Sequence, residues 1–437
     1  MVSLERMRSD ALAAFSAAVF AARPENLVPA RIKRSGNRVL IGDEPLPEAT
    51  GRHVVFAIGK AAPGLAGAWM RELADWTNEL YVLTPHGVPV PQEVDAAATV
   101  LRGAHPYPDA EGEKSTRHIL EVARGLGADD LLVVLLSGGG SALMAAPEEG
   151  LTLDDVSATT RALLEAGAAI NDVNAVRRQL LAAAGGGLAR AAHPAPVHTL
   201  ILSDVLGDPL TDIASGPTTP SRSTAADALA VVNRLALRDR IPETVVAHLT
   251  SRAGTVVDDS YWASEAATTI LGNNRTAVNA AAGELSDRHY EVLIAAEHLV
   301  GEARERGAEL ARAIVVAESS GPSAEVFGGE TTVTVRGKGR GGRNQELALA
   351  AAMELAGAGS TVVLAAGTDG VDGLSDNAGA IVDDTTVERL RKAGIDPAAA
   401  LADNDSATAL DAIGDTIRTG PTGTNVCDLT IALTARS

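Results

Sequence analysis

Leu131-Leu132-Val133-Val134-Leu135-Leu136-Ser137-Gly138-Gly139-Gly140-Ser141 is the stretch of sequence that indicates the fold most clearly. A run of consecutive apolar residues is typical of a strand that is buried on both faces, as in a parallel sheet. Three glycines directly after such a strand cost roughly a kcal/mol each in conformational freedom, so they require a role. We expect a nest of backbone amides for a phosphate or carboxylate. Close packing of another element over the turn is the alternative.

The same pattern of an apolar run, a glycine turn and an alanine- and leucine-rich helical stretch recurs along the chain, which is typical of an α/β protein with parallel sheets and covering helices. The expected strands are His53 to Ile58, Glu79 to Leu83, Leu131 to Leu136, Val197 to Leu202, Thr268 to Leu271, Val292 to Ala295 and Thr361 to Ala365. The expected helices are Ala61 to Ala74, Ala110 to Arg124, Asn171 to Ala184, Ser223 to Leu237, Arg275 to Ser286, Gly301 to Val316 and Arg343 to Leu355. Ligands of such sheets gather at the carboxyl ends of the strands.

Length and composition limit the classes of protein. The chain has 437 residues, of which 46% are hydrophobic, enough for two domains of ordinary size. We place them at residues 1–265 and 266–437, with the boundary in the polar stretch Ser251 to Glu265. The net charge of -19 argues against nucleic acid or an anionic membrane as a partner. A single cysteine, the lack of a signal-peptide core in Met1 to Arg23 and the lack of a membrane-spanning apolar run predict a cytoplasmic protein.

A basic loop stands out against this acidic background. The segment Gly329 to Glu346 joins a β-branched strand to an apolar helix through a loop that contains four cations and four glycines. Glycines let backbone amides approach a ligand, the helix offers its positive dipole end, and arginine forks suit phosphate or carboxylate. The loop therefore predicts an anion site, with a solvated basic turn as the alternative.

Four further strand-end loops combine glycine with charged or hydroxyl groups. Lys60 lies between a strand and a helix, where its ammonium can reach an anion or can simply face solvent. Asp204 and Asp369 follow two other strands and offer the hard oxygen atoms that Mg²⁺ uses beside phosphate, with self-capping turns as the alternative. The fourth loop is Thr419 to Asn425, a polar turn before the last strand. His105 lies in a rigid proline-containing turn, from which it can contact substrate, although a histidine that forms its hydrogen bonds within its own loop is the more common case.

Other chemistries are disfavoured. The triple glycine lacks the spacing of a dinucleotide-binding fingerprint, and Lys338 is followed by Gly339 instead of a hydroxyl residue, so neither loop is a Walker A motif. There is no nucleophile elbow and no HExxH sequence.

The ordered series of loops resembles the glycerate 2-kinase family, whose carboxyl-terminal part is called the MOFRL domain. The resemblance spans almost the entire chain. The segments that carry it are Gly59 to Ala61, Ser137 to Leu143, Ile170-Asn171 with Val176-Arg177, Ser203 to Asp208, Ser215 to Thr218, Gly329 to Thr332, Gly341 to Glu346, Gly367 to Gly370 and Gly420 to Asn425.

This resemblance implies ATP-dependent phosphorylation of D-glycerate at the 2-hydroxyl, giving 2-phosphoglycerate and ADP. It implies a Rossmann-like amino-terminal domain with a parallel sheet and a carboxyl-terminal MOFRL α/β domain, with the active site in the cleft between them. It also implies that Lys60 and Arg343 are the essential catalytic cations, which suits a reaction that needs charge neutralisation and alignment.

The expected site residues fall into three further groups. Substrate and phosphate are assigned to Ser137, Gly138, Gly139, Gly140, Ser141, Arg177 and Asn344; the nucleotide to Gly339, Arg340, Gly341, Gly342, Thr368, Gly370, Thr422 and Gly423; and Mg²⁺ to Asp204 and Asp369. The expected partners are ATP and a small hydroxy acid, and neither nucleic acid nor a membrane is expected. The oligomeric state is left open, with a homodimer as one possibility.

Three alternatives stay open. Departures from the family pattern, such as Leu374-Ser375 in place of Pro-Thr, leave room for a kinase of another small hydroxy acid. A hydroxypyruvate reductase is the second alternative, although the dinucleotide fingerprint is missing. The third is a non-catalytic protein that binds anions.

Overall fold

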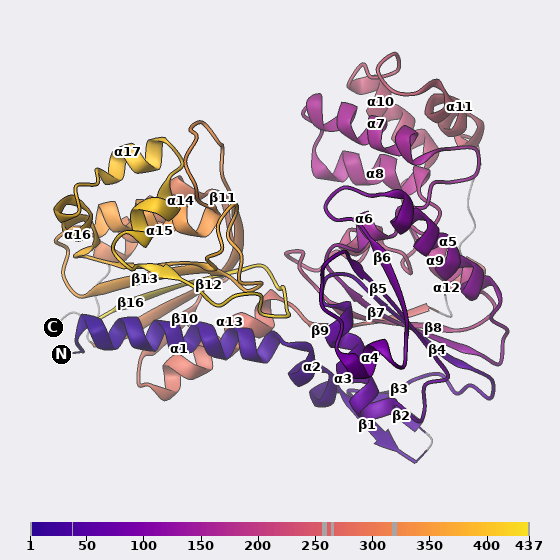
Figure 1. The fold of residues 1–437 in the computed structure, drawn as a ribbon, viewed down its shortest axis with the longest axis horizontal. Helices are drawn as coiled ribbons and strands as arrows, with labels where there is room; N and C mark the ends of the chain where they lie inside the picture. The colour runs from indigo at the N-terminus through magenta and orange to yellow at the C-terminus, as the bar shows by residue number, and fades with distance from the viewer. Residues whose placement is uncertain (1, 37, 256–259, 264–265, 317–320, 436–437) are drawn as a thin grey trace. The chain divides into compact units, whose positions relative to one another are not determined.

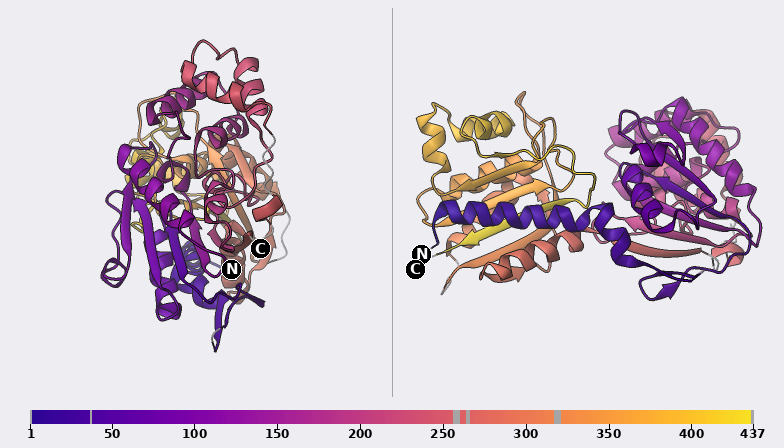
Figure 2. Two further views of the ribbon diagram at one scale, coloured as in Figure 1. Left: turned by 90° about the vertical axis from the view of Figure 1, so that its right-hand side faces the viewer. Right: turned by 60° about the horizontal axis from the view of Figure 1, so that its bottom comes forward.

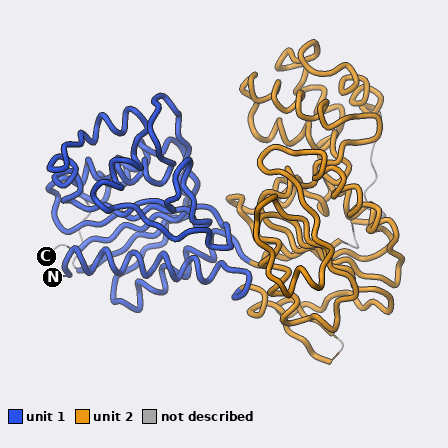
Figure 3. The backbone as a smooth tube through the Cα atoms, viewed as in Figure 1, with its two compact units in different colours: residues 1–26, 272–437 blue, residues 27–271 orange. Residues whose placement is uncertain are grey.

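The chain folds into two compact units. The structure is a computed structural model that describes residues 2–36, 38–255, 260–263, 266–316 and 321–435. Residues 27–271 form one unit, here called the parallel-sheet unit, and residues 1–26 with 272–437 form the other, the mixed-sheet unit (Figure 3). The domain boundary expected at residue 265 lies outside the described residues. Both units combine a sheet with covering helices, so the α/β class is confirmed.

The parallel-sheet unit is built on a six-stranded sheet with the order β6-β5-β4-β7-β8-β9. Its strands are β4 (His53–Ile58), β5 (Glu79–Pro85), β6 (Thr99–Gly103), β7 (Leu131–Ser137), β8 (Val197–Leu202) and β9 (Ala266–Gly272). Strands β4 to β8 are parallel, as predicted. The chain adds β5 and β6 on one side of β4 and then β7 and β8 on the other, so the strand order reverses between β4 and β7. Such a switch point is where open α/β sheets bind ligands.

Helices and a small sheet complete this unit (Figure 1). They are α2 (Pro24–Arg31), α3 (Ala62–Leu73), α4 (Gln92–Asp95), α5 (Ala110–Arg124), α6 (Gly140–Leu143), α7 (Leu153–Glu165), α8 (Ile170–Leu180), α9 (Gly187–Ala192), the 3-10 turn Ile213–Ser215, α10 (Ala225–Arg234), α11 (Glu243–Arg252) and α12 (Ser260–Ala263), with β1 (Ile32–Ser35), β2 (Arg38–Ile41) and β3 (Glu44–Pro45). Helices α5, α6 and α9 share a core with β4, β7 and β8. Helices α7, α8, α10 and α11 enclose a second core away from the sheet.

The mixed-sheet unit departs from the expected parallel arrangement. Its main path is β10-β12-β16-β13-β14-β15, and β11 also pairs with β12. The strands are β10 (Glu291–Ile294), β11 (Leu299–Glu302), β12 (Ser323–Thr332), β13 (Thr361–Gly367), β14 (Gly379–Asp383), β15 (Thr416–Ile417) and β16 (Asp428–Thr434). β16 is antiparallel to both of its neighbours, β12 and β13. The expectation of parallel sheets throughout was therefore wrong here, because the carboxyl-terminal strand inserts in the middle of the sheet.

Helices cover both faces of the mixed sheet (Figures 1 and 2). α1 (Leu4–Ala22) and α13 (Asn274–Asp287) lie side by side on one face. The other helices are α14 (Ala303–Val316), α15 (Arg343–Leu355), α16 (Thr386–Lys392), α17 (Pro397–Ala402) and α18 (Ser406–Asp411). α14 and α15 share an apolar core with β13 and β14 on the opposite face. None of the helices in the described ranges is long and apolar enough to cross a membrane.

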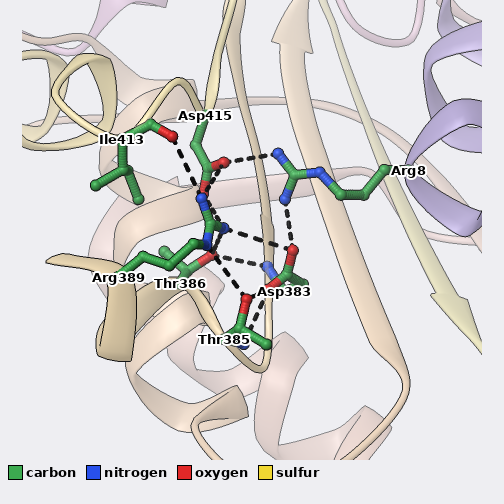
Figure 4. A network of polar contacts seen from close by, with 7 residues as sticks. All are labelled: Arg8, Asp383, Thr385, Thr386, Arg389, Ile413 and Asp415. Atoms are coloured by element: carbon green, nitrogen blue, oxygen red, sulfur yellow. Dashed lines mark hydrogen bonds and ion pairs between the residues drawn. The ribbon is translucent and has the colours of Figure 1, made fainter. Parts of the chain in front are cut away.

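Helix α1 belongs to the mixed-sheet unit although it is encoded at the start of the chain. Its buried apolar face includes Met7, Ala11 and Phe15. Arg8 donates to Asp383 at 2.6 Å and to Asp415 at 2.7 Å, and Arg389 holds Asp415 from the other side at 2.7 Å (Figure 4). Both carboxylates are almost fully buried. The sequence did not indicate this attachment, since the partners are separated by about 375 to 407 positions.

Candidate active site

In the parallel-sheet unit, the expected residues gather at the switch point. Lys60 follows β4, and its backbone N–H donates to the Gly138 carbonyl at 2.9 Å. The Ala61 N–H donates to Ser137 Oγ at 3.1 Å, and Ser137 Oγ donates to the Ile58 carbonyl at 3.3 Å. These bonds join the turn after β4 to the turn after β7, while the Lys60 side chain is exposed. The sheet therefore fixes a cation beside the glycine turn.

Close packing explains why this turn has no side chains. A β-carbon on Gly138 would lie 1.7 Å from Asp204 Oδ2, and one on Gly140 would lie 2.6 Å from Ala214 Cβ. A β-carbon on Gly139 would lie 3.1 Å from both Lys60 Cγ and His105 Cδ2, and Gly139 also has a left-handed φ of 86°. The three glycines thus let a carboxylate, a cation and an imidazole approach one turn. We call Lys60, His105, Asp204 and residues 137–141 the glycine-turn cluster.

One arginine of α8, Arg177, borders this cluster. Arg177 Nη2 donates to the Ser141 carbonyl at 3.0 Å, and burial lowers the pKa of its guanidinium. Ser141 Oγ is 2.8 Å from Ser215 Oγ, so this hydroxyl already has a partner. Arg178 instead pairs with Asp212. Arg177 is therefore held against the end of the glycine turn.

His105 is held in this cluster by its own loop. Asp109, the N-cap of α5, accepts from the N–H groups of Ala104 at 3.0 Å and Gly112 at 2.8 Å, and contacts His86 Nε2 at 2.8 Å. Burial and then the charge of Lys60 lower the pKa of the His105 imidazole to about 4. The ring is uncharged at neutral pH.

In the mixed-sheet unit, Arg343 is the first residue of α15 and is fixed by two carboxylates. It forms two parallel bonds with Asp428, 2.5 Å from Nε to Oδ2 and 2.9 Å from Nη2 to Oδ1, and Nη1 lies 3.0 Å from Glu330 Oε1. Burial opposes its charge, but the hydrogen bond to Asp428 and the surrounding carboxylates hold its pKa above the ordinary value. About a third of the side chain stays exposed. The guanidinium is oriented and still accessible.

Asp372 caps the same helix from a neighbouring loop. Its two oxygens accept from the N–H groups of Asn344 at 3.0 Å and Gln345 at 2.8 Å. The N-cap residue, Gly342, has no side chain to do this, and a β-carbon there would lie 2.3 Å from Asp372 Oδ1. Burial raises the pKa of Asp372 to about 7. Asn344, an expected substrate ligand, is buried and turns its amide toward Asp372 at 3.4 Å. We call Glu330, Arg343, Asp369, Asp372 and Asp428 the α15 cluster.

The basic loop differs from its expected use. Its N–H groups donate within the protein: Arg336 and Gly337 to Asn404 Oδ1 at 2.7 and 2.9 Å, Lys338 to Asp403 Oδ1 at 3.0 Å, and Arg340 to Asp405 Oδ1 at 2.8 Å. These amides are thus occupied by the segment 403–405, whose own carboxylates take the place of an external anion. The glycines at 337, 339 and 341 allow the close approach of this segment. The side chains of Lys338 and Arg340 remain exposed.

The remaining expected nucleotide residues lie in two loops that pack together. Thr368 is buried and donates to the Cys427 carbonyl at 2.7 Å, and Thr422 donates to the Thr368 carbonyl at 2.6 Å. Gly370, with a φ of 86°, allows the Gly420 carbonyl to approach. Gly423 is exposed at the turn. The hydroxyls of the two threonines therefore fix the loops, while the turn at Gly423 is the accessible part.

The two expected metal ligands lie in different units. The Asp204 carboxylate lies against Gly138, as described above. Asp369 Oδ1 accepts from the Val371 N–H at 3.1 Å, and a β-carbon on Gly367 would lie 3.1 Å from Asp369 Oδ1 and 3.4 Å from Asp428 Oδ1. Asp369 and Asp428 thus face the same strand end. Among the described residues, no cluster of three or more acidic, histidine or cysteine side chains has metal-binding geometry.

The sequence predicted site roles for Lys60, Asp204 and residues 137–141 of the glycine-turn cluster, but of the α15 cluster only for Arg343 and Asp369. Asp372 lies in the same loop as Asp369, and Asp428 lies shortly after the motif Gly420 to Asn425. Neither residue was assigned a role. The sequence feature that could have indicated both residues is a carboxylate close to the end of a strand. Their partner, the first turn of α15, is distant in sequence and cannot be read from either loop alone.

Comparisons with known proteins match both parts of the chain. A family described as "Domain of unknown function (DUF4147)" matches residues 10–250, and the MOFRL family matches residues 323–428. A D-glycerate 2-kinase of Thermotoga maritima is 38% identical over 396 residues, which cover 89% of this chain and 93% of the relative. A protein of Agrobacterium vitis named "Putative hydroxypyruvate reductase" is 42% identical over 397 residues, 88% of each chain.

A solved structure is also similar. The crystal structure of a glycerate kinase from Thermotoga maritima matches with a TM-score of 0.86 and 35% identity, covering 98% of this chain and 100% of that chain.

Proposed function

The chain belongs to the glycerate 2-kinase family with a carboxyl-terminal MOFRL domain, and from this premise we propose that it transfers the γ-phosphoryl group of ATP to the 2-hydroxyl of D-glycerate. The hydroxyl oxygen forms a bond to the γ-phosphorus, the bond from that phosphorus to the bridging oxygen breaks, and ADP leaves with the electron pair. The products are 2-phosphoglycerate, ADP and the proton of the hydroxyl. Such a reaction depends on alignment and charge stabilisation more than on a nucleophilic side chain.

One observation carries the proposal: an exposed lysine is fixed beside a side-chain-free turn at the switch point of a parallel sheet. Lys60 supplies a mobile point charge for a transferring phosphoryl group or a carboxylate. The turn 137–141 and Arg177 supply the remaining contacts for the hydroxy acid and its phosphate. Asn344 is included among the proposed substrate contacts, although its amide must turn away from Asp372 to serve.

Arg343 is proposed as the second catalytic cation. Two parallel hydrogen bonds with Asp428 fix the direction of the Arg343 guanidinium in advance. Little reorganisation is therefore needed when negative charge develops on the transferring phosphoryl group. The exposed basic loop with Gly339, Arg340, Gly341 and Gly342, and the loops with Thr368, Gly370, Thr422 and Gly423, are proposed to hold the nucleotide. In this proposal Arg340 acts through its side chain, because its N–H already bonds Asp405.

The residues also fit Mg²⁺. This ion is commonly held by one or two carboxylates together with phosphate oxygens and water, so a large protein ligand set is not required. The α15 cluster has more carboxylates than cations, which would repel a bare triphosphate and favours one that arrives with its metal ion. We propose Asp204 or Asp369 as the protein ligand; when bound, the ion would neutralise charge on the phosphates.

The proposal is tested with purified protein, ATP, Mg²⁺ and a panel of hydroxy acids. ADP release measures turnover, and phosphorus NMR identifies the phosphorylated hydroxyl. Lys60→Ala and Arg343→Lys should each lower kcat about 10²- to 10³-fold, the first because its charge is lost and the second because a lysine cannot form the two parallel bonds with Asp428 that orient the guanidinium. Lys114→Ala, an exposed lysine on α5, is the control. Wild-type turnover in the Lys60 variant would contradict the assigned role.

The reductase remains the second candidate because two relatives from Agrobacterium vitis carry the name "Putative hydroxypyruvate reductase". The glycine turn lacks a dinucleotide fingerprint, which argues against it. NADH consumption with hydroxypyruvate, in the absence of ATP turnover on any hydroxy acid of the panel, would reverse the order of the two candidates.

A further inference from the structure

His105 is placed in the glycine-turn cluster by a rigid support. Asp109 closes the loop 104–109 with bonds to the N–H groups of Ala104 and Gly112, and thereby ties the loop to the first turn of α5. The imidazole rests on the bare Cα of Gly139, with Cδ2 3.1 Å and Nε2 3.4 Å from the place of a β-carbon. Lys60 Cγ lies 3.1 Å from that same β-carbon position. The side chains of Lys60 and His105 thus lie next to each other against Gly139.

The hydrogen-bonding capacity of this ring is unused by the protein. In the part of the chain that the structure describes, no hydrogen bond or ion pair to the His105 ring is formed. Half-burial and the neighbouring ammonium both disfavour a second positive charge on the imidazole. A neutral imidazole has one N–H donor and one nitrogen lone pair, so it can accept a hydrogen bond, whereas Lys60 and Arg177 can only donate.

We propose that His105 contacts the hydroxy acid and orients its 2-hydroxyl by accepting the hydrogen bond of that group; this inference rests on the proposed kinase function. The cations beside it suit the carboxylate and the phosphoryl group, but neither can accept the hydroxyl hydrogen. Ser141 is engaged with Ser215, and Asp204 is one of the two carboxylates proposed for the metal ion. The ring nitrogen therefore directs the hydroxyl hydrogen away from the phosphorus and leaves an oxygen lone pair for attack.

The test uses two variants of the full-length protein. His105→Phe keeps a flat ring against Gly139 but removes both nitrogens, and His105→Gln keeps a neutral polar group. We expect His105→Phe to lower kcat/KM for D-glycerate roughly 10- to 100-fold, the value of one hydrogen bond to substrate, with the KM for ATP unchanged. His105→Gln should recover part of the loss. His118→Gln, the same change at an exposed histidine on α5, is the control.

A second readout separates contact from simple packing. 3-Hydroxypropionate retains the carboxylate and the 3-hydroxyl but lacks the 2-hydroxyl, so its inhibition constant should be the same in wild type and in His105→Phe. An equal loss of affinity for glycerate and for this analogue, or a kcat/KM within twofold of wild type, would overturn the inference. If the wild type does not phosphorylate glycerate at all, the proposed function itself fails, and the two failures are distinguishable.

Discussion

Asp372 shows how the ionisation of one buried group can affect the stability of this protein. Burial raises its pKa to about 7 in the folded state, above the ordinary value of about 4 for an unfolded aspartate. Between these values the folded protein binds a proton that the unfolded chain has released. The stability contributed by this group is therefore present below pH 4 and is lost as the pH rises toward 7.

We predict that the free energy of unfolding of wild type, relative to Asp372→Asn, falls by up to about 4 kcal/mol between pH 4 and pH 8. Urea unfolding at several pH values measures this difference. Asp227→Asn is the control, because the pKa of this exposed capping residue is lowered and its contribution changes only at more acidic pH. A constant difference for Asp372→Asn would mean that the amides of α15 keep the carboxylate ionised throughout.

At the scale of the element, α1 is the clearest case of a helix fixed by both apolar and ionic contacts. Arg8→Ala should lower the free energy of unfolding by about 2 to 4 kcal/mol, because Asp383 and Asp415 stay buried and retain Arg389 as their cationic partner, beside hydrogen bonds from Thr385 and Thr386. Arg312→Ala, which removes an exposed ion pair with Glu354, should cost less than about 1 kcal/mol. Equal losses in the two variants would contradict a special role for Arg8.

The free energy of unfolding that is lost in Arg8→Ala should depend on pH, with a sign that follows from the pKa of Asp383. Burial opposes the charge of Asp383, but Thr385 and Arg8 hold its pKa below the ordinary value. Its contribution is thus present above the unfolded pKa and disappears as the pH falls through the folded pKa. The difference between wild type and Arg8→Ala should narrow in strong acid.

Local patterns predicted most elements but not their pairing. The buried strands β4, β7 and β8 are continuous apolar runs, so the sequence alone located them and predicted that they run parallel. The mixed sheet could not be predicted in the same way, because β16 joins β12 and β13 by contacts between distant residues. Likewise, Lys60 and the glycine turn were found from local composition, whereas the roles of Asp372 and His105 depend on which loop lies opposite them.

At the scale of the whole molecule, the sequence of the parallel-sheet unit is inserted within the sequence of the mixed-sheet unit. The parallel-sheet unit is continuous, while the mixed-sheet unit consists of residues 1–26 and 272–437. We predict that a fragment of residues 27–271 folds alone, with a cooperative thermal transition and native circular dichroism. A fragment of residues 272–437 should be poorly soluble, since it exposes the face that α1 covers, and adding residues 1–26 at its amino end should restore solubility. A soluble, folded 272–437 fragment would contradict this view.

The position of β16 in the middle of the mixed sheet also sets an order of events during biosynthesis. About 400 residues are translated between the end of α1 and the start of β16, which takes roughly 20 to 80 s on a ribosome. Helix α1 is therefore made long before the complete sheet that it packs against, and its apolar face stays uncovered while the parallel-sheet unit is synthesised. The mixed sheet can form only after β16 has left the ribosome, so a nascent chain stalled before that point contains a complete parallel-sheet unit and a mixed-sheet unit that still lacks its central strand.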